Sequence, residues 1–252
     1  MSTIEAAVSG SHAEGVLIDT AEIPGGGELR LLRHGRHFEI MFGGEQLMAS
    51  WSYRSEQALA TLALGGVSEH ARVLIGGLGM GFTLAAARAS LPPGATIVVA
   101  ELVPKIVTWA KGVLRHLFGG SLEDIRVSVQ VSDVHDVVVQ QPARFDAILL
   151  DVDNGPDGLI SLANERLYSE WGLRALRMAL RPGGVLGVWS AYQDDSFTYR
   201  LCAAGFDVEE VSVDTEGGED NPFHTIWLAT ADRSGHGLNE ASAVEPWIEA
   251  AA

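Results

Sequence analysis

From Arg72 onward, short apolar runs alternate with longer amphipathic segments, a pattern typical of βα units on a parallel sheet. Val73–Ile75 and Ile148–Leu150 are continuously apolar, as expected of strands covered on both faces, so we place them at the centre of the sheet. The predicted strands are Val73–Gly76, Thr96–Glu101, Ile125–Gln130, Ala147–Asp151, Val185–Ser190, Val208–Val213 and Thr225–Ala229. The predicted helices span about Gly81–Ser90, Lys105–Leu117, Asn164–Leu180 and Asp195–Ala204.

A different pattern precedes this region. Short apolar runs at Leu29–Arg33, His37–Phe42 and Gln46–Ser50, separated by glycine-containing turns, predict a small antiparallel meander. Helical spacing from Ser55 through Leu64 then predicts a linking helix. We therefore expect a flexible N-terminal arm (1–28), a β appendage with its linking helix (29–70), a main α/β domain (71–232) and a flexible tail (233–252).

The charge balance narrows the choice of partners. The 252 residues hold 17 Lys and Arg against 33 Asp and Glu, a formal net charge of −16. This argues against binding a nucleic-acid backbone, and it suits a cationic small substrate as well as simple solubility. The longest uncharged stretch, Val73–Ala87, contains four glycines and is shorter than the ~18 apolar residues of a membrane span. One cysteine, Cys202, and a start without a basic-then-apolar signal favour a cytoplasmic setting.

A glycine cluster follows the first strand of the main domain, at Gly76, Gly77, Gly79 and Gly81. Glycines there let the backbone pass close to a bound nucleoside, although a tight turn without a ligand has the same pattern. Glu101 closes the next strand, roughly 20 residues further on, where a carboxylate can accept both ribose hydroxyls. The two features predict an adenosine-containing ligand without separating a dinucleotide from S-adenosylmethionine.

Two further acids follow later strands. Asp133 comes just after the third strand, placed to accept from an adenine amine, and Asp151 closes the fourth. Because open α/β sheets bind ligands at the carboxyl ends of their strands, we expect Glu101, Asp133 and Asp151 to converge on one crevice.

These residues give the chain a resemblance to the spermidine synthase-like branch of the class I S-adenosylmethionine-dependent methyltransferase fold, from about Leu29 to Ala229. No single motif is specific to this family, so the resemblance depends on the order and spacing of several motifs. The resemblance implies an α/β fold with a Rossmann-like, doubly wound, seven-stranded, mainly parallel sheet and a small N-terminal β appendage. The motifs are the appendage with Ser55-Glu56, Val73–Gly81, Glu101, Asp133, Phe145–Pro156, Arg181–Gly184 and Pro222–Leu228.

The resemblance also implies roles. The glycines contact the methionine part of S-adenosylmethionine or of its decarboxylated form, Glu101 the ribose and Asp133 the adenine. Asp151 stands where aminopropyltransferases hold the acid that orients or deprotonates the attacking amine, and Asp153 lies close by. An ammonium has no free lone pair, so alkyl transfer requires a group that removes a proton and aims the nitrogen. The implied cofactor-binding set is Gly76, Gly77, Gly79, Gly81, Glu101, Leu102, Ser132, Asp133 and Val134.

Three departures from the family change the expected reaction. The glycine loop lacks the acid that spermidine synthases carry there, and Arg54-Ser55 replaces a Tyr-Gln or Tyr-His pair before Glu56. The usual Asp-Ser-Ser-Asp becomes the run Asp151–Asn154. Arg54 would repel a polyamine and pair with a carboxylate. Alternatively, its side chain lies over the surface of the β appendage. The departures favour methyl transfer from intact S-adenosylmethionine to a small amine, with polyamine aminopropyl transfer as the alternative.

Other residues complete the expected site. Tyr192 and Asp194 line the acceptor pocket or cap the strand end, and His224 approaches the same rim or is a structural histidine. Arg54 and Glu56 complete the substrate-binding set. No cluster of His, Cys, Asp or Glu has the spacing of metal ligands, so we predict no metal site. The appendage offers a homodimer interface of the kind common in the family. Two rival interpretations stay open: a non-catalytic nucleoside-binding protein, and an NAD-dependent dehydrogenase, which leaves Asp133 and Asp151 without a role.

Overall fold

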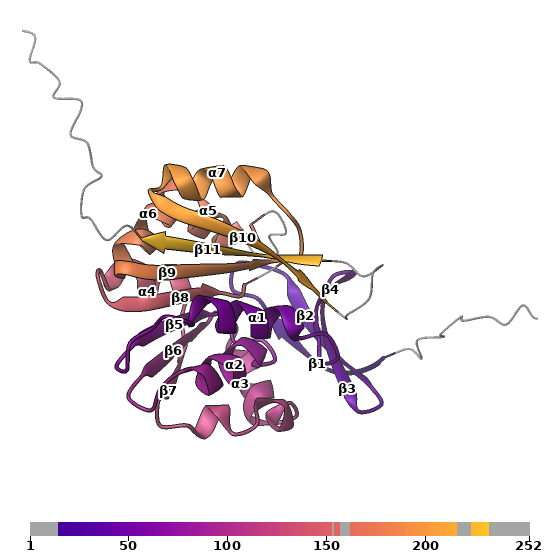
Figure 1. Cartoon of the computed structure of the whole chain (residues 1–252). Helices are drawn as coiled ribbons and strands as arrows, with labels where there is room; N and C mark the ends of the chain where they lie inside the picture. The colour runs from indigo at the N-terminus through magenta and orange to yellow at the C-terminus, as the bar shows by residue number, and fades with distance from the viewer. Residues whose placement is uncertain (1–14, 153, 157–161, 216–222, 232–252) are drawn as a thin grey trace, which may run out of the picture.

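The computed structural model describes residues 15–152, 154–156, 162–215 and 223–231, which form two sheets and the helices that cover them (Figure 1). The larger sheet has seven strands in the order β10-β11-β9-β8-β5-β6-β7, and the smaller has four in the order β1-β2-β3-β4. The predicted fold class is confirmed. The larger sheet consists of β5 (Arg72–Gly76), β6 (Thr96–Glu101), β7 (Val127–Val131), β8 (Phe145–Leu150), β9 (Leu180–Ser190), β10 (Phe206–Asp214) and β11 (Phe223–Ala231). The smaller consists of β1 (Val16–Glu22), β2 (Glu28–His34), β3 (His37–Phe42) and β4 (Glu45–Ala49).

The two continuously apolar strands lie in the centre of the larger sheet, as predicted. β5 pairs in parallel with both β6 and β8, and Leu74 and Ile148 are fully buried. The strands from β7 to β9 are parallel, whereas β11 pairs antiparallel with β9 and β10. The carboxyl ends of β5, β6, β7 and β8 therefore meet at one edge, which the smaller sheet covers (Figure 1).

Helices cover both faces of the larger sheet. Side chains of α1, α2 and α3 belong to one buried cluster, together with residues of the small sheet, and those of α4, α5, α6 and α7 belong to a second cluster on the other face. In Figure 1, α5, α6 and α7 lie in the upper part of the molecule, and α2 and α3 lie in the lower part beside β6 and β7. The helices are α1 (Arg54–Ala63), α2 (Phe82–Ser90), α3 (Pro104–Lys111), α4 (Val134–Gln140), α5 (Leu162–Tyr168), α6 (Glu170–Ala179) and α7 (Asp195–Ala203), with 3₁₀ turns η1 (Arg115–Phe118) and η2 (Ser121–Glu123).

Strand β1 lies where the sequence predicts a mobile arm through residue 28. Its pairing with β2 and two contacts to α3 order it: Trp109 Nε1 donates to Asp19 Oδ2 at 2.9 Å, and Lys105 Nζ lies 3.0 Å from the same oxygen. These contacts bridge about 90 positions of sequence, so a local polar composition does not reveal them. The remainder of the predicted arm, 1–14, and the predicted tail from 233 lie outside the described residues.

Two helix predictions were wrong in their extent, and one helix was not predicted. The helix predicted to run to Leu117 ends at Lys111, because the backbone of Gly112 leaves the helical region. The helix predicted from Asn164 is two helices, and Ser169 caps the second by accepting from the Gly172 amide. Helix α4 was not predicted; it begins at the cap that Asp133 provides by accepting from the His135 amide.

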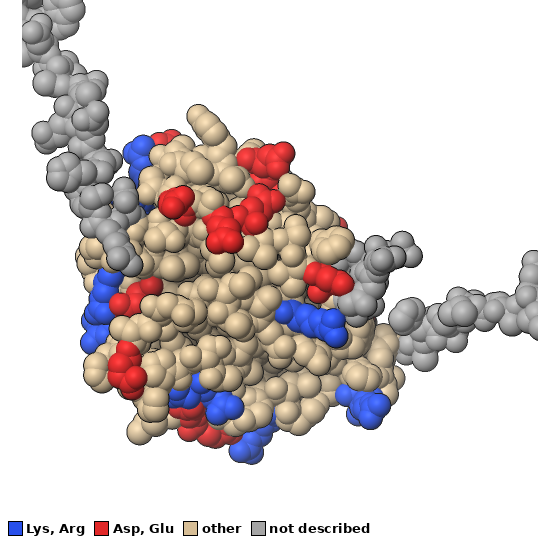
Figure 2. Space-filling view, in the orientation of Figure 1, with Lys and Arg blue, Asp and Glu red and all other residues tan. Residues whose placement is uncertain are grey.

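Charge is unevenly distributed over the face seen in Figure 1. Acidic side chains gather over α7 and β10 in Figure 2, where Asp207, Glu209 and Glu210 are exposed, and the middle of this face is mostly uncharged. Within the described residues, no helix is long and apolar enough to cross a membrane.

Candidate active site

A cavity of about 920 Å³, open solvent included, lies between the carboxyl ends of the central strands and the small sheet. It brings together acids that are far apart in the sequence: Glu56, Glu101, Asp133 and Asp151. Of the other predicted residues, Gly77, Gly79, Leu102 and Val134 also line it. The small sheet supplies an apolar wall that the sequence analysis did not anticipate, made of Ile23, Leu29, Ile40, Leu47 and Met48.

The glycine loop is packed so closely that side chains would not fit. Gly77 has a φ of +90°, and a Cβ placed there would collide with the carbonyl oxygen of Asp151. A Cβ at Gly79 would collide with the side chain of Met48 across the cavity. Gly76 and Gly81 do not line the cavity; Gly76 lies under Val134, and Gly81 starts α2 in the left-handed region. The glycines thus let the loop pack against Asp151, the acid that follows β8. A loop without side chains also lets a ligand come close to its backbone.

Glu101 joins the glycine loop to the start of α3. Its Oε2 accepts from the Leu78 amide and its Oε1 from the Val103 amide, each at 2.8 Å. Burial raises the pKa of this carboxyl, and the amide hydrogen bonds oppose that rise. The amides of Gly79 and Leu102 also lower that pKa, so four backbone N–H groups face this carboxyl at the cavity.

Asp133 lines the cavity, although both of its oxygens already have partners. Oδ1 accepts from the His135 amide at 2.8 Å and so caps α4, while Oδ2 accepts from Arg166 Nη2 at 2.6 Å. Contact with an exocyclic amine stays a prediction, since it would use the remaining acceptor capacity of these oxygens. Ser132 donates its amide to the carbonyl of Glu101 at 3.0 Å, and its hydroxyl has no partner among the described residues.

Glu56 and Asp151 form a pair of acids in the cavity. Burial raises the pKa of Glu56 to about 7, with the negative charge of Asp151 as the second cause. Burial also raises the pKa of Asp151 to about 6, while a hydrogen bond from Thr83 opposes the rise. Two carboxyls with pKa values near neutrality can take up a proton at physiological pH. Asp153, predicted to be the second member of the acid pair, lies outside the described residues.

Thr83, which was not among the predicted site residues, and Ser55, which was given no role of its own, contact these two acids. Thr83 lies in the first turn of α2 and bonds to Asp151, a position that its place just after the glycine loop could have suggested. Ser55 Oγ donates to Glu56 Oε2 at 2.7 Å and lies 2.8 Å from His224 Nδ1. Trp189 lines the cavity, and its indole nitrogen is buried without a partner in the described part of the chain.

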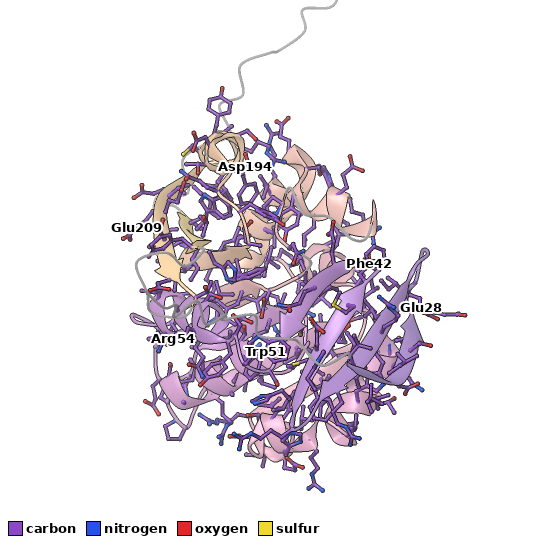
Figure 3. All side chains as sticks on the ribbon, turned by 90° about the vertical axis from the view of Figure 1, so that its right-hand side faces the viewer. Glu28, Phe42, Trp51, Arg54, Asp194 and Glu209 are labelled. Carbon is purple, nitrogen blue, oxygen red and sulfur yellow. The ribbon has the colours of Figure 1, made fainter. Side chains whose placement is uncertain are left out.

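The other predicted substrate-binding residues lie away from the cavity lining. Asp194 caps α7 by accepting from the amides of Ser196 and Phe197. Although burial raises the pKa of Asp194, its hydrogen bonds with Ser196 and Phe197 and the charge of Arg200 hold that pKa below its ordinary value. Arg54 and Tyr192 are exposed, and Figure 3 shows Arg54 well apart from Asp194. Their role in substrate binding stays a prediction that depends on movement or on residues outside the described part.

His224 also stands outside the cavity lining, but a contact connects it to the site. Its ring lies edge-on to Trp189, with ring centroids 4.8 Å apart, and it reaches Glu56 through Ser55. Burial lowers the pKa of His224. In the described ranges, no group of three or more His, Cys, Asp or Glu side chains is placed to hold a metal ion.

The chain matches curated proteins of one kind. It is 32% identical over 182 residues to the polyamine aminopropyltransferases of Mycobacterium tuberculosis and Mycobacterium bovis, which covers 69% of this chain and 33% of those proteins. A polyamine aminopropyltransferase of Nitrosomonas europaea is 33% identical over 92 residues, covering 36% of this chain and 27% of that protein. The chain thus spans about a third of the length of the mycobacterial relatives it matches. No family model matches it.

Solved structures agree with the sequence relatives. The crystal structure of spermidine synthase from Thermotoga maritima matches with a TM-score of 0.68 and 15% identity, over 86% of this chain and 74% of that one. A probable spermidine synthase from Corynebacterium glutamicum matches with a TM-score of 0.58 and 17% identity, over 90% and 84%. The resemblance predicted from the sequence is confirmed: the chain is a distant relative of the polyamine aminopropyltransferases and has the spermidine synthase fold.

Proposed function

We propose that the protein transfers an aminopropyl group from decarboxylated S-adenosylmethionine to an amine held between Glu56 and Asp151. The observation that carries the proposal is this pair of buried acids in one cavity with the glycine loop and Glu101. The sequence analysis favours methyl transfer, but the relatives that the chain matches are named for aminopropyl transfer, and we give that reaction precedence.

The residues of the cavity suit the nucleoside part of such a donor. Glu101 presents a carboxyl to the cavity where a ribose would lie, and Gly77 and Gly79 line the same cavity with backbone. The apolar wall of the small sheet suits an adenine ring or an alkyl chain. The donor supplies a sulfonium whose neighbouring carbon accepts the nitrogen lone pair as the carbon–sulfur bond breaks.

The acid pair supplies what the acceptor needs. An amine enters as an ammonium, and two carboxylates attract it; one of them then removes a proton, which frees the lone pair. Because the pKa values of Glu56 and Asp151 are raised to about 7 and about 6, each is a stronger base than an ordinary carboxylate. We expect Asp151 to act as the base and Glu56 to share its proton.

Methyl transfer stays a second candidate because of the glycine loop. Leu78 and Met80 are buried apolar residues in the loop where spermidine synthases carry an acid. Without that acid, the site loses an attraction for the free amine of the decarboxylated donor, and the carboxylate of intact S-adenosylmethionine is repelled less.

Calorimetric titration with each donor separates the two candidates. We expect tighter binding of decarboxylated S-adenosylmethionine than of the intact form, and weaker binding of both by Asp133→Ala if this side chain contacts adenine. Preference for the intact form would favour methyl transfer, and binding of neither would overturn both candidates. A binding protein without catalytic activity would bind a donor and turn over no amine.

A further inference from the structure

A short hydrogen-bond chain leads from the cavity to the sheet edge. Ser55 Oγ donates to Glu56 Oε2 at 2.7 Å, and the same oxygen lies 2.8 Å from His224 Nδ1. The two ends lie on different elements, Glu56 on α1 and His224 on β11, and Ser55 and His224 are 169 positions apart in the sequence. One hydroxyl therefore connects a cavity acid to an imidazole.

Burial isolates this hydroxyl from competing partners. Ser55 is 1% exposed and Glu56 is 7% exposed, whereas His224 is half-buried and packs edge-on against Trp189. Neither Ser55 nor His224 lines the cavity. The chain thus begins at a buried acid that lines the cavity and ends at a ring that solvent can reach in part.

We infer that Ser55 and His224 carry the proton released by the amine away from Glu56, so that the acid is restored for each turnover. This inference rests on the proposed function, because only a reaction that releases a proton in the cavity requires such a route. Both residues act through Glu56, so they are positioning residues for the proton and not catalytic residues.

The proton passes from the amine to solvent along this chain. The amine nitrogen forms its bond to carbon, the carbon–sulfur pair stays on sulfur, and the amine proton passes to a carboxylate of the acid pair. Glu56 then gives its proton to Ser55 Oγ, which passes its own hydrogen to His224 Nδ1. Before this transfer the hydroxyl turns towards His224, and after it the hydroxyl again donates to Glu56. The imidazolium loses its Nε2 proton to solvent, and the neutral ring then exchanges its Nδ1 proton for one on Nε2 through solvent, which restores the start.

His224 is a weaker base than Glu56, because burial raises the pKa of Glu56 to about 7 and lowers that of His224, so release to solvent draws the proton along the chain. Burial lowers the pKa of His224, so the ring is neutral near pH 7 and its nitrogen can accept. The charged groups on the described elements that reach it are Glu56, through Ser55 on α1, and Asp151 beyond Glu56; Trp189 on β9 contributes a ring and no charge. A negative Glu56 draws a proton onto the chain, and solvent at the ring removes it.

Kinetics of His224→Gln and Ser55→Ala test the route, with His70→Gln, an exposed histidine before β5, as the control. With decarboxylated S-adenosylmethionine and putrescine, we expect kcat at pH 7 to fall about tenfold or more in both variants, with an unchanged donor KM. The loss should shrink above about pH 9, where hydroxide takes the proton directly, and imidazole in the buffer should restore turnover to His224→Ala. A kcat within about twofold of the wild type, or a loss without any response to imidazole or pH, would overturn the inference.

A second measurement does not depend on turnover. The imidazole of His224, followed by NMR between pH 4 and 9, should titrate differently in Ser55→Ala and in Glu56→Gln than in the wild type, because both changes break the coupling to the acid. An identical titration in all three proteins would contradict the chain itself. If the coupling is present and the wild type turns over no amine, the proposed function fails and the proton route fails with it, while the hydrogen-bond chain stands.

Discussion

Thr83 Oγ1 donates a hydrogen bond of 2.5 Å to Asp151 Oδ2. The bond joins the first turn of α2, which follows the glycine loop, to the acid at the end of β8, so the loop and the proposed base are held by one contact. Gly77 also packs against the carbonyl of Asp151, so two contacts, one from Thr83 and one from Gly77, fix the position of this acid.

Thr83→Val should raise the pKa of Asp151 further, since the lost hydrogen bond stabilises the ionised carboxyl. Valine matches the shape of threonine, so the buried site should stay filled. We expect the acidic limb of the kcat/KM profile to move to higher pH and the rate at pH 6 to fall severalfold. Thr61→Val, on the exposed side of α1, is the matched control, and an unshifted profile for Thr83→Val would contradict this prediction.

The acid pair should make the protein less stable as pH rises. The pKa of Glu56 is raised from 4.5 to about 7 on folding, so its contribution is present below pH 4.5 and is lost as pH rises towards 7. Glu56→Gln should remove this loss. Between pH 5 and pH 8, its free energy of unfolding should fall by roughly 1–3 kcal/mol less than that of the wild type. Urea unfolding at both pH values measures the difference, with the exposed Glu45→Gln as control. The same pH dependence in wild type and Glu56→Gln would show that the pair is not coupled to folding.

Gly77→Ala should destabilise the loop. An added Cβ meets the Asp151 carbonyl at a φ of +90°, a region that costs an alanine roughly 1–2 kcal/mol even without a collision. Gly66→Ala provides the comparison, because a Cβ there meets nothing within 4 Å. Thermal unfolding should separate the two variants clearly, and donor binding should be lost only in Gly77→Ala. Equal melting temperatures would mean that the loop has room to relax.

Glu101→Gln should weaken nucleoside binding. The amide nitrogen of glutamine cannot accept from the Leu78 or Val103 amide, so one buried N–H loses its partner and the loop shifts. We expect the Kd for the donor to rise about tenfold or more by calorimetry. Glu69→Gln, exposed before β5 and remote from the cavity edge, should bind as the wild type does. Unchanged binding by Glu101→Gln would remove Glu101 from the proposed ribose site.

The sequence was informative where topology determines position. Glu101, Asp133 and Asp151 each end a parallel strand, and parallel strands end at one edge, so their convergence followed from the order of elements. The hydrogen-bond partners of these acids could not be predicted from the sequence. Arg166 donates to Asp133 from 33 positions away, and Thr83 donates to Asp151 from 68 positions away. Such contacts depend on how helices pack, which local patterns do not encode.

The small sheet also makes contacts that local sequence patterns do not predict. The meander through Ser50 was predicted, but not β1 or the wall that Leu47 and Met48 present to the cavity. The side chain of Met48 lies against Gly79 because the sheet folds over the strand ends, a tertiary relationship without a signature in either segment.

Turnover by the wild type and by Asp151→Asn tests the central claim most directly. With decarboxylated S-adenosylmethionine and putrescine, mass spectrometry should find an aminopropylated amine and 5′-methylthioadenosine in equal amounts from the wild type. Asp151→Asn should be slower by at least about 100-fold, with a donor Kd within about threefold of the wild type. No product from the wild type, or an Asp151→Asn variant as fast as the wild type, would contradict the claim that this cavity transfers an alkyl group with Asp151 as its base.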